Sequence, residues 1–172
     1  MRQLVFIDET ALNTKMARGY GRCPVGRRCV SAIPHGHWQS WTFLAALRHE
    51  SIEAPFLVEG PVDAEVFTVY LERVLCPQLR PGDTVILDNL STHKIQNVAP
   101  LLALRGAAVR YLPPYSPDLN PIELAFAKLK AQLRQAAARR WEELHLALAV
   151  ALNSFTSQEC TAFFRHAQYT SI

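Results

Sequence analysis

A proline-rich stretch near the middle of the chain, residues 111–130, places the strongest local constraint on the fold. Its closely spaced prolines exclude a helix interior and bias the residues before them toward extended backbone. Asn120 is a good N-cap, and Pro121 fits the first position of a helix. Glu123 then lies in the first helical turn, where it can form a capping box with Asn120. The stretch therefore predicts a loop that leads into a helix with a carboxylate at its start.

Two continuous apolar runs each lead into an aspartate. The runs cover residues 4–7 and 84–87, and Asp8 and Asp88 follow them directly. Apolar runs of this length are typical of strands that are buried on both faces of a sheet. Open α/β sheets place their sites at the carboxyl ends of such strands. We therefore expect neighbouring central strands with Asp8 and Asp88 side by side, and Glu9 on the opposite face because side chains alternate.

The order of the other expected elements predicts the fold class. Further strands are expected at 30–34, 40–47, 52–58 and 107–112, and further helices between 63 and 77 and at 94–105, 121–139, 141–154 and 157–167. Asp63 and Ser157 are the expected N-caps of two of these helices. This order describes a mixed α/β sheet with helices on both faces. At 172 residues the chain is expected to be a single domain.

Composition and charge restrict the class of protein. No apolar run reaches the ~18 residues of a membrane-spanning helix, and the first residues do not form a secretory signal. A formal net charge of +3 is mildly basic and compatible with a nucleic-acid partner. Residues 13–29 gather basic side chains among glycines, which indicates either a solvated connection or a flexible arm that contacts phosphates.

The four cysteines do not indicate a disulfide framework in a chain of this length. Cys23 and Cys29 precede His35 and His37, an order that raises the question of a zinc site. The spacing contains neither a C-x2-C knuckle nor an H-x3-H pair. Buried or surface thiols are therefore favoured over zinc.

The acids Asp8, Asp88 and Glu123 together predict a metal-dependent reaction. Two carboxylates at adjacent strand ends repel each other unless a cation shares them. Oxygen ligands suit Mg²⁺ or Mn²⁺, and a third carboxylate from a helix start would complete a site for two ions. Two ions about 3.5–4 Å apart can activate an attacking hydroxyl and stabilise the leaving oxygen in phosphoryl transfer. Without these partners, Glu123 is interpreted as a helix cap.

Three motifs around these acids resemble the catalytic domain of mariner-like DDE transposases, in the bacterial insertion-sequence branch. They are Ile-Asp-Glu at 7–9, Leu-Asp-Asn at 87–89 with His93 and Lys94 after it, and Tyr-Ser-Pro-Asp-Leu-Asn-Pro-Ile-Glu at 115–123. The resemblance spans essentially the whole chain. It implies an RNase H-like fold with a mixed five-stranded sheet, and it makes Asp8, Asp88 and Glu123 a catalytic triad that binds two Mg²⁺ or Mn²⁺ ions.

The resemblance also implies a reaction and partners. The reaction is nicking of double-stranded DNA at transposon ends, followed by attack of the freed 3′-hydroxyl on a target phosphodiester. Because two ends must be joined, a homodimer is expected, in the bacterial cytoplasm. Asn89 and His93 match the family motif and are expected to orient the substrate or the metal ligands. Contacts with DNA phosphates are expected from Lys94, Lys128, Lys130 and Arg134. A solvated helix face is the alternative interpretation of these basic residues.

The chain departs from the resembled family in two respects. Members usually carry a helix-turn-helix region before the catalytic domain, whereas this chain starts at the first catalytic strand. A separate chain with that region is therefore an expected partner, and a truncated relic is the alternative. Phe126 stands where tryptophan is commoner. A nuclease that cuts without joining, and a catalytically silent DNA-binding or assembly module, remain alternative functions. Loss of a triad acid would favour the silent module, and none is lost.

Overall fold

The sheet has five strands in the order β3-β2-β1-β4-β5. The computed structural model describes residues 3–30, 32, 34–35, 37–88 and 98–169. The strands are β1 (Leu4–Asn13), β2 (Ser40–Leu47), β3 (Ile52–Glu59), β4 (Thr84–Leu87) and β5 (Ala108–Tyr111). β1, β2 and β3 pair antiparallel, whereas β4 and β5 add to β1 in parallel. The prediction of a mixed five-stranded sheet is therefore confirmed.

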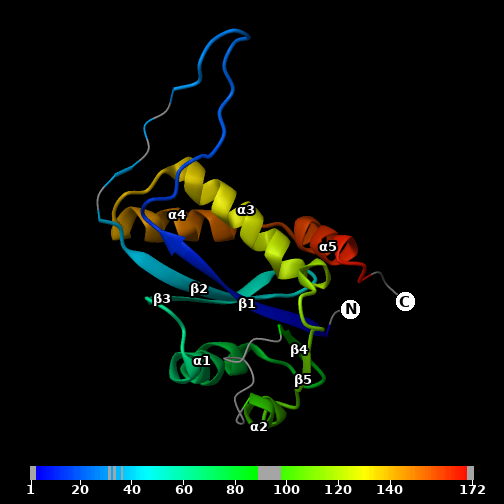
Figure 1. Ribbon diagram of the computed structural model, residues 1–172. Helices are drawn as coiled ribbons and strands as arrows, with labels where there is room; N and C mark the ends of the chain where they lie inside the picture. The colour runs from blue at the N-terminus through cyan, green and yellow to red at the C-terminus, as the bar shows by residue number, and fades with distance from the viewer. Residues whose placement is uncertain (1–2, 31, 33, 36, 89–97, 170–172) are drawn as a thin grey trace.

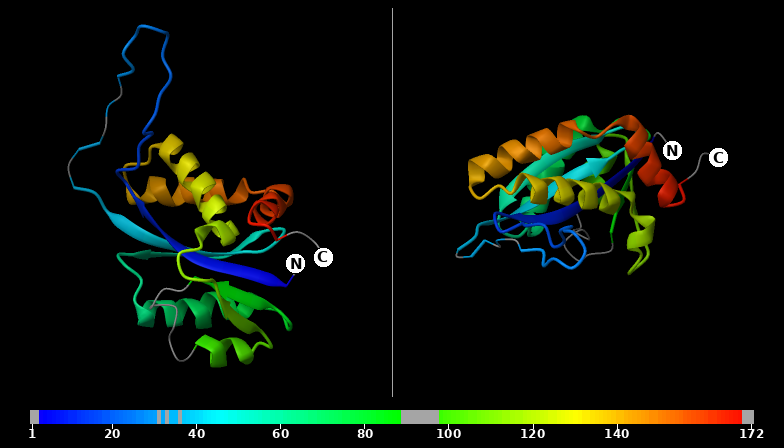
Figure 2. Two further views of the ribbon diagram at one scale, coloured as in Figure 1. Left: turned by 45° about the vertical axis from the view of Figure 1, so that its right-hand side comes forward. Right: turned by 90° about the horizontal axis from the view of Figure 1, so that it is seen from above.

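Helices cover both faces of this sheet (Figure 1). One face carries α1 (Ala64–Tyr70), its continuations η1 (Leu71–Leu75) and η2 (Cys76–Gln78), and α2 (Val98–Ala103). The other carries α3 (Pro121–Ala136), α4 (Trp141–Asn153) and α5 (Ser157–His166), with the short η4 (Pro117–Leu119) before α3 (Figure 2). α2 represents the helix expected over 94–105, of which 94–97 lie outside the described residues. In the described part of the chain, no helix has the length and apolarity needed to cross a bilayer.

Strand β1 separates two hydrophobic cores because its side chains alternate between the faces of the sheet. Phe6 and Leu12 pack in the core under α3, α4 and α5. Val5 and Ile7 pack in the opposite core, against α1, η1 and α2. The expectation of a central strand that is buried on both faces is confirmed.

The position of Asp8 differs from the prediction, because Asp8 lies inside β1 and does not end it. The parallel pairing of β1 with β4 stops at Ile7 and Leu87. The antiparallel pairing with β2 continues to Asn13. Since β2 supplies backbone partners beyond the end of β4, β1 extends past its acid. Asp8 therefore marks the point at which one neighbouring strand ends.

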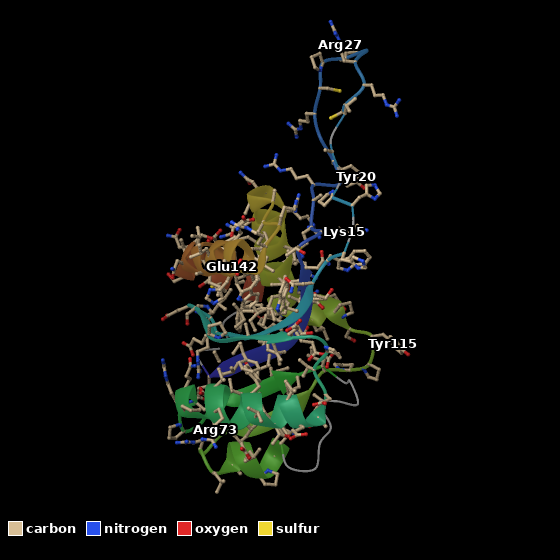
Figure 3. The ribbon with its side chains drawn as sticks, turned by 90° about the vertical axis from the view of Figure 1, so that its left-hand side faces the viewer. Lys15, Tyr20, Arg27, Arg73, Tyr115 and Glu142 are labelled. Carbon is tan, nitrogen blue, oxygen red and sulfur yellow. The ribbon has the colours of Figure 1, made fainter. Side chains whose placement is uncertain are left out.

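The chain between β1 and β2 projects from the body as a long arm (Figure 1). Lys15 and Tyr20 lie along it, and Arg27 lies at its tip (Figure 3). At its base, the backbone N–H of Thr14 donates to the carbonyl of Gln39 at 3.3 Å. The strand expected at 30–34 is wrong, because its described residues lie in this arm and form no strand.

Of the two predicted helix caps, one is confirmed and the other is wrong by one residue. Asp63 caps α1, since its Oδ1 accepts from the backbone N–H of Val66 at 2.9 Å. The cap of α5 is Thr156 and not Ser157. Thr156 forms a capping box with Glu159, in which each side chain bonds to the backbone N–H of the other residue. Thr156 caps the helix in preference to the adjacent Ser157 because Glu159, three residues after Thr156, can return a hydrogen bond to it.

Candidate active site

A cleft with a volume of about 430 Å³ lies where β4 ends and α3 begins. Its described lining includes the three predicted acids, Asp8, Asp88 and Glu123. Asp8 comes from β1, Asp88 directly follows β4, and Glu123 lies in the first turn of α3. The fold thus brings together side chains from three segments that are far apart in the sequence. Their roles in metal binding and catalysis remain predictions.

Strand register places Asp8 and Asp88 on the same face of the sheet. Each follows the last residue of the paired segment of β1 and β4. Phe6 and Ile86 precede the two acids by two positions and share the core under α3. Because side chains two residues apart point the same way, both acids face that side. Neighbouring strands lie about 4.8 Å apart, so the two acids lie side by side as predicted.

Asp8 is buried, with 6% of the residue exposed, and each of its carboxylate oxygens accepts a hydrogen bond. Its Oδ1 accepts from the backbone N–H of Glu9 at 2.7 Å. Its Oδ2 accepts from Nδ2 of Asn120 at 2.8 Å. The carboxylate is therefore fixed in orientation from both ends. A fixed carboxylate loses little conformational freedom when it binds a ligand.

The capping box between Asn120 and Glu123, the local alternative to a role of Glu123 in the site, does not form. Asn120 precedes α3, but in the described chain its side chain makes no hydrogen bond to the α3 backbone. The Asn120 side chain turns into the protein and donates to Asp8. Glu123 is exposed, and its carboxylate has no hydrogen-bond or ion-pair partner among the described residues. Its position at the cleft therefore does not result from a capping role.

Asn120 is the site residue that sequence reasoning missed. Its good capping propensity supplied a sufficient local explanation. The available signal was its place in the motif 115–123, three residues before Glu123 and on a loop expected to lie over Asp8. A buried contact between residues separated by 112 positions gives no periodic signal in the sequence.

The loop between β5 and α3 forms the rim of the cleft. Tyr115, at its centre, has a φ of 56°, the left-handed region that residues other than glycine rarely adopt. Its side chain is fully exposed and points away from the body of the molecule (Figure 3). The loop is braced where Ser116 Oγ donates to the Pro114 carbonyl at 3.3 Å. The neighbouring prolines restrict the backbone of this rim, because each fixes its own φ.

The other predicted site residues do not belong to the described lining of the cleft. Asn89, His93 and Lys94 lie outside the described residues. Lys128 and Lys130 are half-buried on α3, and Arg134 is exposed in its last turn. The expected contacts of these residues with DNA remain predictions.

Lys128 is engaged between helices. Its Nζ lies 2.6 Å from Oε1 of Glu159 on α5 and donates to the Ser154 carbonyl at 3.3 Å. The same ammonium lies 4.3 Å from the centroid of the Phe155 ring. The hydrogen bond from Lys128 is the main cause that lowers the pKa of Glu159. A phosphate would have to compete with these contacts, so Lys128 acts here as a tie between α3 and α5.

The donor set of the cleft fits a hard divalent cation in its chemistry, since three carboxylates supply only oxygen ligands. Residues 3–88 and 98–169, apart from the gaps in the arm, contain no group of three His, Cys, Asp or Glu close enough to hold one ion. The three acids thus line one cleft without converging on a common point. Glu123 is the exposed member of the three.

The four cysteines are unpaired thiols, two of them exposed and two of them buried. Cys23 and Cys29 are exposed on the arm, and Cys76 and Cys160 are buried. The Cys23 thiol donates to the carbonyl of Arg27 at 3.0 Å. Burial raises the pKa of Cys160 to about 11, which keeps this thiol protonated at neutral pH. The described cysteines and histidines form no zinc cluster.

Sheet order, helices on both faces and an acidic cleft at the end of β4 define an RNase H-like α/β protein. The family model described as DDE superfamily endonuclease matches residues 3–145, and the chain belongs to this family. A comparison with curated protein sequences gives no match.

Solved structures of the Mos1 mariner transposase share the fold. The Mos1 strand transfer complex matches with a TM-score of 0.72 and 18% identity, over 98% of this chain and 52% of that chain. The paired end complex with Mn matches with a TM-score of 0.68 and 17% identity, over 98% of this chain and 53% of that chain. The Mos1 catalytic domain with Raltegravir and Mg matches with a TM-score of 0.67 and 15% identity, over 98% of this chain and 79% of that chain. The chain thus spans about half the length of the longer Mos1 chains.

Proposed function

We propose that this chain is the catalytic domain of a DNA transposase of the bacterial insertion-sequence branch, with Asp8, Asp88 and Glu123 as its catalytic acids. The observation that supports the proposal is their common position in one cleft. Membership of the DDE superfamily endonuclease family supports cutting of DNA as the reaction type. The motif at 115–123 supports the branch.

A divalent cation is the proposed cofactor, and Asp8, Asp88 and Glu123 would hold it. Mos1 structures are described as complexes with Mn and with Mg, which supports the same ions here. A pair of such ions would activate the attacking oxygen and stabilise the leaving oxygen. The fixed carboxylate of Asp8 would supply a ligand that needs little reorganisation. The exposed Glu123 supplies the ligand that has the most freedom to adjust.

The proposed reaction has two in-line displacements at phosphorus. In the first, a water oxygen forms a bond to phosphorus while the bond to the 3′-oxygen breaks, and the 3′-oxygen leaves as a hydroxyl. In the second, that 3′-hydroxyl attacks a target phosphodiester and releases the target's own 3′-hydroxyl. The role of the protein is to position the acids and the phosphate, because neither step needs a covalent bond to the chain.

The proposed substrate is double-stranded DNA, and the proposed assembly is a homodimer that works together with a helix-turn-helix DNA-binding region. Structures of Mos1 are described as a strand transfer complex and as a paired-end complex with the left transposon end. On this chain, the basic arm offers phosphate contacts through exposed side chains such as Lys15 and Arg27 (Figure 3). The cytoplasm, at the nucleoid, is the proposed location.

A plasmid assay tests cutting and joining together. The chain is incubated with Mg²⁺ or Mn²⁺, supercoiled plasmid and a fluorescent duplex that has a free 3′-hydroxyl. We expect nicked plasmid and fluorescence transferred to it, and loss of both in Asp88→Asn and Glu123→Gln. Glu142→Gln is the control, because Glu142 is an exposed acid at the start of α4, away from the cleft (Figure 3).

Each other outcome contradicts part of the proposal. Nicking without transfer of the label identifies a nuclease on the same fold. Plasmid binding without nicking or transfer, when the helix-turn-helix DNA-binding region is also supplied, identifies the silent module. Activity that survives in both acid variants overturns the assignment of the triad.

A further inference from the structure

Asn120 has three properties that neither helix capping nor core packing explains. The residue is 5% exposed and lines the same cleft as Asp88 and Glu123. Its Nδ2 donates to Asp8 Oδ2 at 2.8 Å. Its Oδ1 is buried and has no hydrogen-bond partner in the part of the chain that the structure describes. One half of the amide is therefore engaged with an acid of the site, and the other half is left unsatisfied.

The chemistry of the contact determines which end of the amide faces Asp8. A carboxylate accepts hydrogen bonds and donates none, so the NH₂ group must lie against it. The reversed amide would place two acceptor oxygens 2.8 Å apart. The unsatisfied carbonyl is thus a consequence of the bond to Asp8. A buried unsatisfied acceptor costs free energy, which an apolar side chain of similar size would avoid.

The contact also links two of the proposed catalytic acids. Asn120 directly precedes α3, and Glu123 lies three residues later in the first turn of that helix. Asp8 lies in β1 at the end of the β4 pairing. The hydrogen bond therefore ties the start of the helix that carries one acid to the carboxylate of the other. Without this hydrogen bond, the Asp8 side chain would lose one of its contacts. The start of α3, and with it Glu123, would no longer be fixed relative to Asp8.

We propose that Asn120 is a positioning residue of the cation site, which holds Asp8 in orientation and fixes the start of α3 relative to it. This inference rests on the proposed function, in which the acids bind a divalent cation. Residues that orient metal ligands typically contribute 10–100-fold to metal affinity. The proposal therefore predicts a change in ion binding that can be measured without DNA and without turnover.

The first test compares Mn²⁺ affinity by calorimetry in Asn120→Leu and Asn120→Ala. Leu keeps approximately the volume of the side chain and removes the donor, whereas Ala removes both. A positioning role through the NH₂ group predicts about 10–100-fold weaker binding in both variants. A packing role predicts that Leu retains wild-type affinity, and that result overturns the proposal. Thr14→Val is the matched control, because it alters a buried polar side chain at the base of the arm and should leave the affinity unchanged.

The second test uses the wild-type chain, so it does not depend on the folding of a variant. The side-chain amide signal of Asn120 is followed by ¹H–¹⁵N NMR while Mg²⁺ is added. A tie to a metal ligand predicts that this signal shifts with the binding curve, whereas the exposed amide of Asn153 stays in place. A signal that does not move while Mg²⁺ binds overturns the proposal.

Asp88→Ala separates failure of this inference from failure of the proposed function. If Asp88→Ala loses Mn²⁺ binding while Asn120→Leu binds like the wild type, only the role of Asn120 falls. If Asp88→Ala binds Mn²⁺ as the wild type does, the acidic cleft is not the cation site and the proposed function falls with it.

Discussion

Arg48 and Asp83 form a buried ion pair that connects the end of β2 to the turn before β4. Arg48 Nη1 and Nη2 donate to the two carboxylate oxygens of Asp83 at 2.9 and 2.6 Å. The two side chains are 6% and 3% exposed. Arg48 also donates to Glu53 at 2.6 Å. Because β4 leads into Asp88, this network anchors the strand that delivers one acid to the cleft.

Arg48→Met should lower the free energy of unfolding by about 3–5 kcal/mol, because it leaves the Asp83 carboxylate buried without its partner. Urea denaturation measures the effect. The double variant with Asp83→Leu should recover much of the loss, since neither charge of the Arg48–Asp83 pair then remains buried. Arg140→Met removes an exposed pair with Glu143 and should cost about 0–1 kcal/mol. Equal losses in the two single variants would contradict the account.

The same pair predicts how stability depends on pH. Burial alone would raise the pKa of Asp83, but hydrogen bonds from Arg48 and from the backbone N–H of Arg80 lower it below its ordinary value. A carboxyl whose pKa is depressed by folding stabilises the protein above its unfolded pKa of about 4. That stabilisation is lost as the pH falls through the lower folded pKa. Urea titrations between about pH 5 and pH 2 should show a smaller acid-induced loss in Asp83→Asn than in the wild type.

Ala137→Gly should stabilise the protein by about 1 kcal/mol. Ala137 ends α3 with a φ of 53°, and its N–H donates to the Leu133 carbonyl at 3.1 Å. The left-handed conformation at this position costs an alanine about 1–2 kcal/mol and costs glycine little, although glycine has more freedom to lose on folding. Ala136→Gly, one residue earlier inside the helix, should destabilise by about 0.5–1 kcal/mol. Thermal melts that show the same sign for both variants would contradict the helix end described here.

Arg134 and Lys128 should affect DNA binding differently, although both lie on α3. Arg134→Gln removes an exposed charge, and we expect it to lower the log–log salt slope of duplex binding by about 1. Lys128→Gln removes a charge that Glu159 already holds, so we expect a smaller change in the slope and a lower melting temperature. Fluorescence anisotropy at several salt concentrations measures the slopes. A larger slope change for Lys128 would show that it leaves Glu159 to contact phosphate.

Sequence reasoning predicted the features that depend on local pattern. The apolar runs at 4–7 and 84–87 gave the central strands, because burial on both faces leaves a continuous apolar signal. The neighbouring positions of Asp8 and Asp88 followed from the expectation that those two strands lie side by side in the centre of the sheet. The start of α3 at Pro121 followed from proline's fixed φ and missing N–H.

The features that were missed depend on partners far away in the sequence. β1 runs beyond Asp8 because β2 supplies backbone partners as far as Asn13. Asn120 forgoes a local cap bond because Asp8, 112 positions earlier, offers a carboxylate in a buried site. Local propensity indicates which conformations and hydrogen bonds a residue favours, but tertiary contacts can override that preference.

Whether the three acids form a cation site is tested by calorimetric Mn²⁺ titration of the wild type, Asp88→Ala and Glu123→Ala, with and without a DNA duplex. Glu142→Ala is the matched control, because it removes an exposed acid outside the cleft. We expect that the wild type and the control bind Mn²⁺, that Asp88→Ala does not, and that Glu123→Ala binds more weakly. Equal binding by all four chains would show that the three carboxylates do not form a cation site, and would contradict the proposed transposase mechanism.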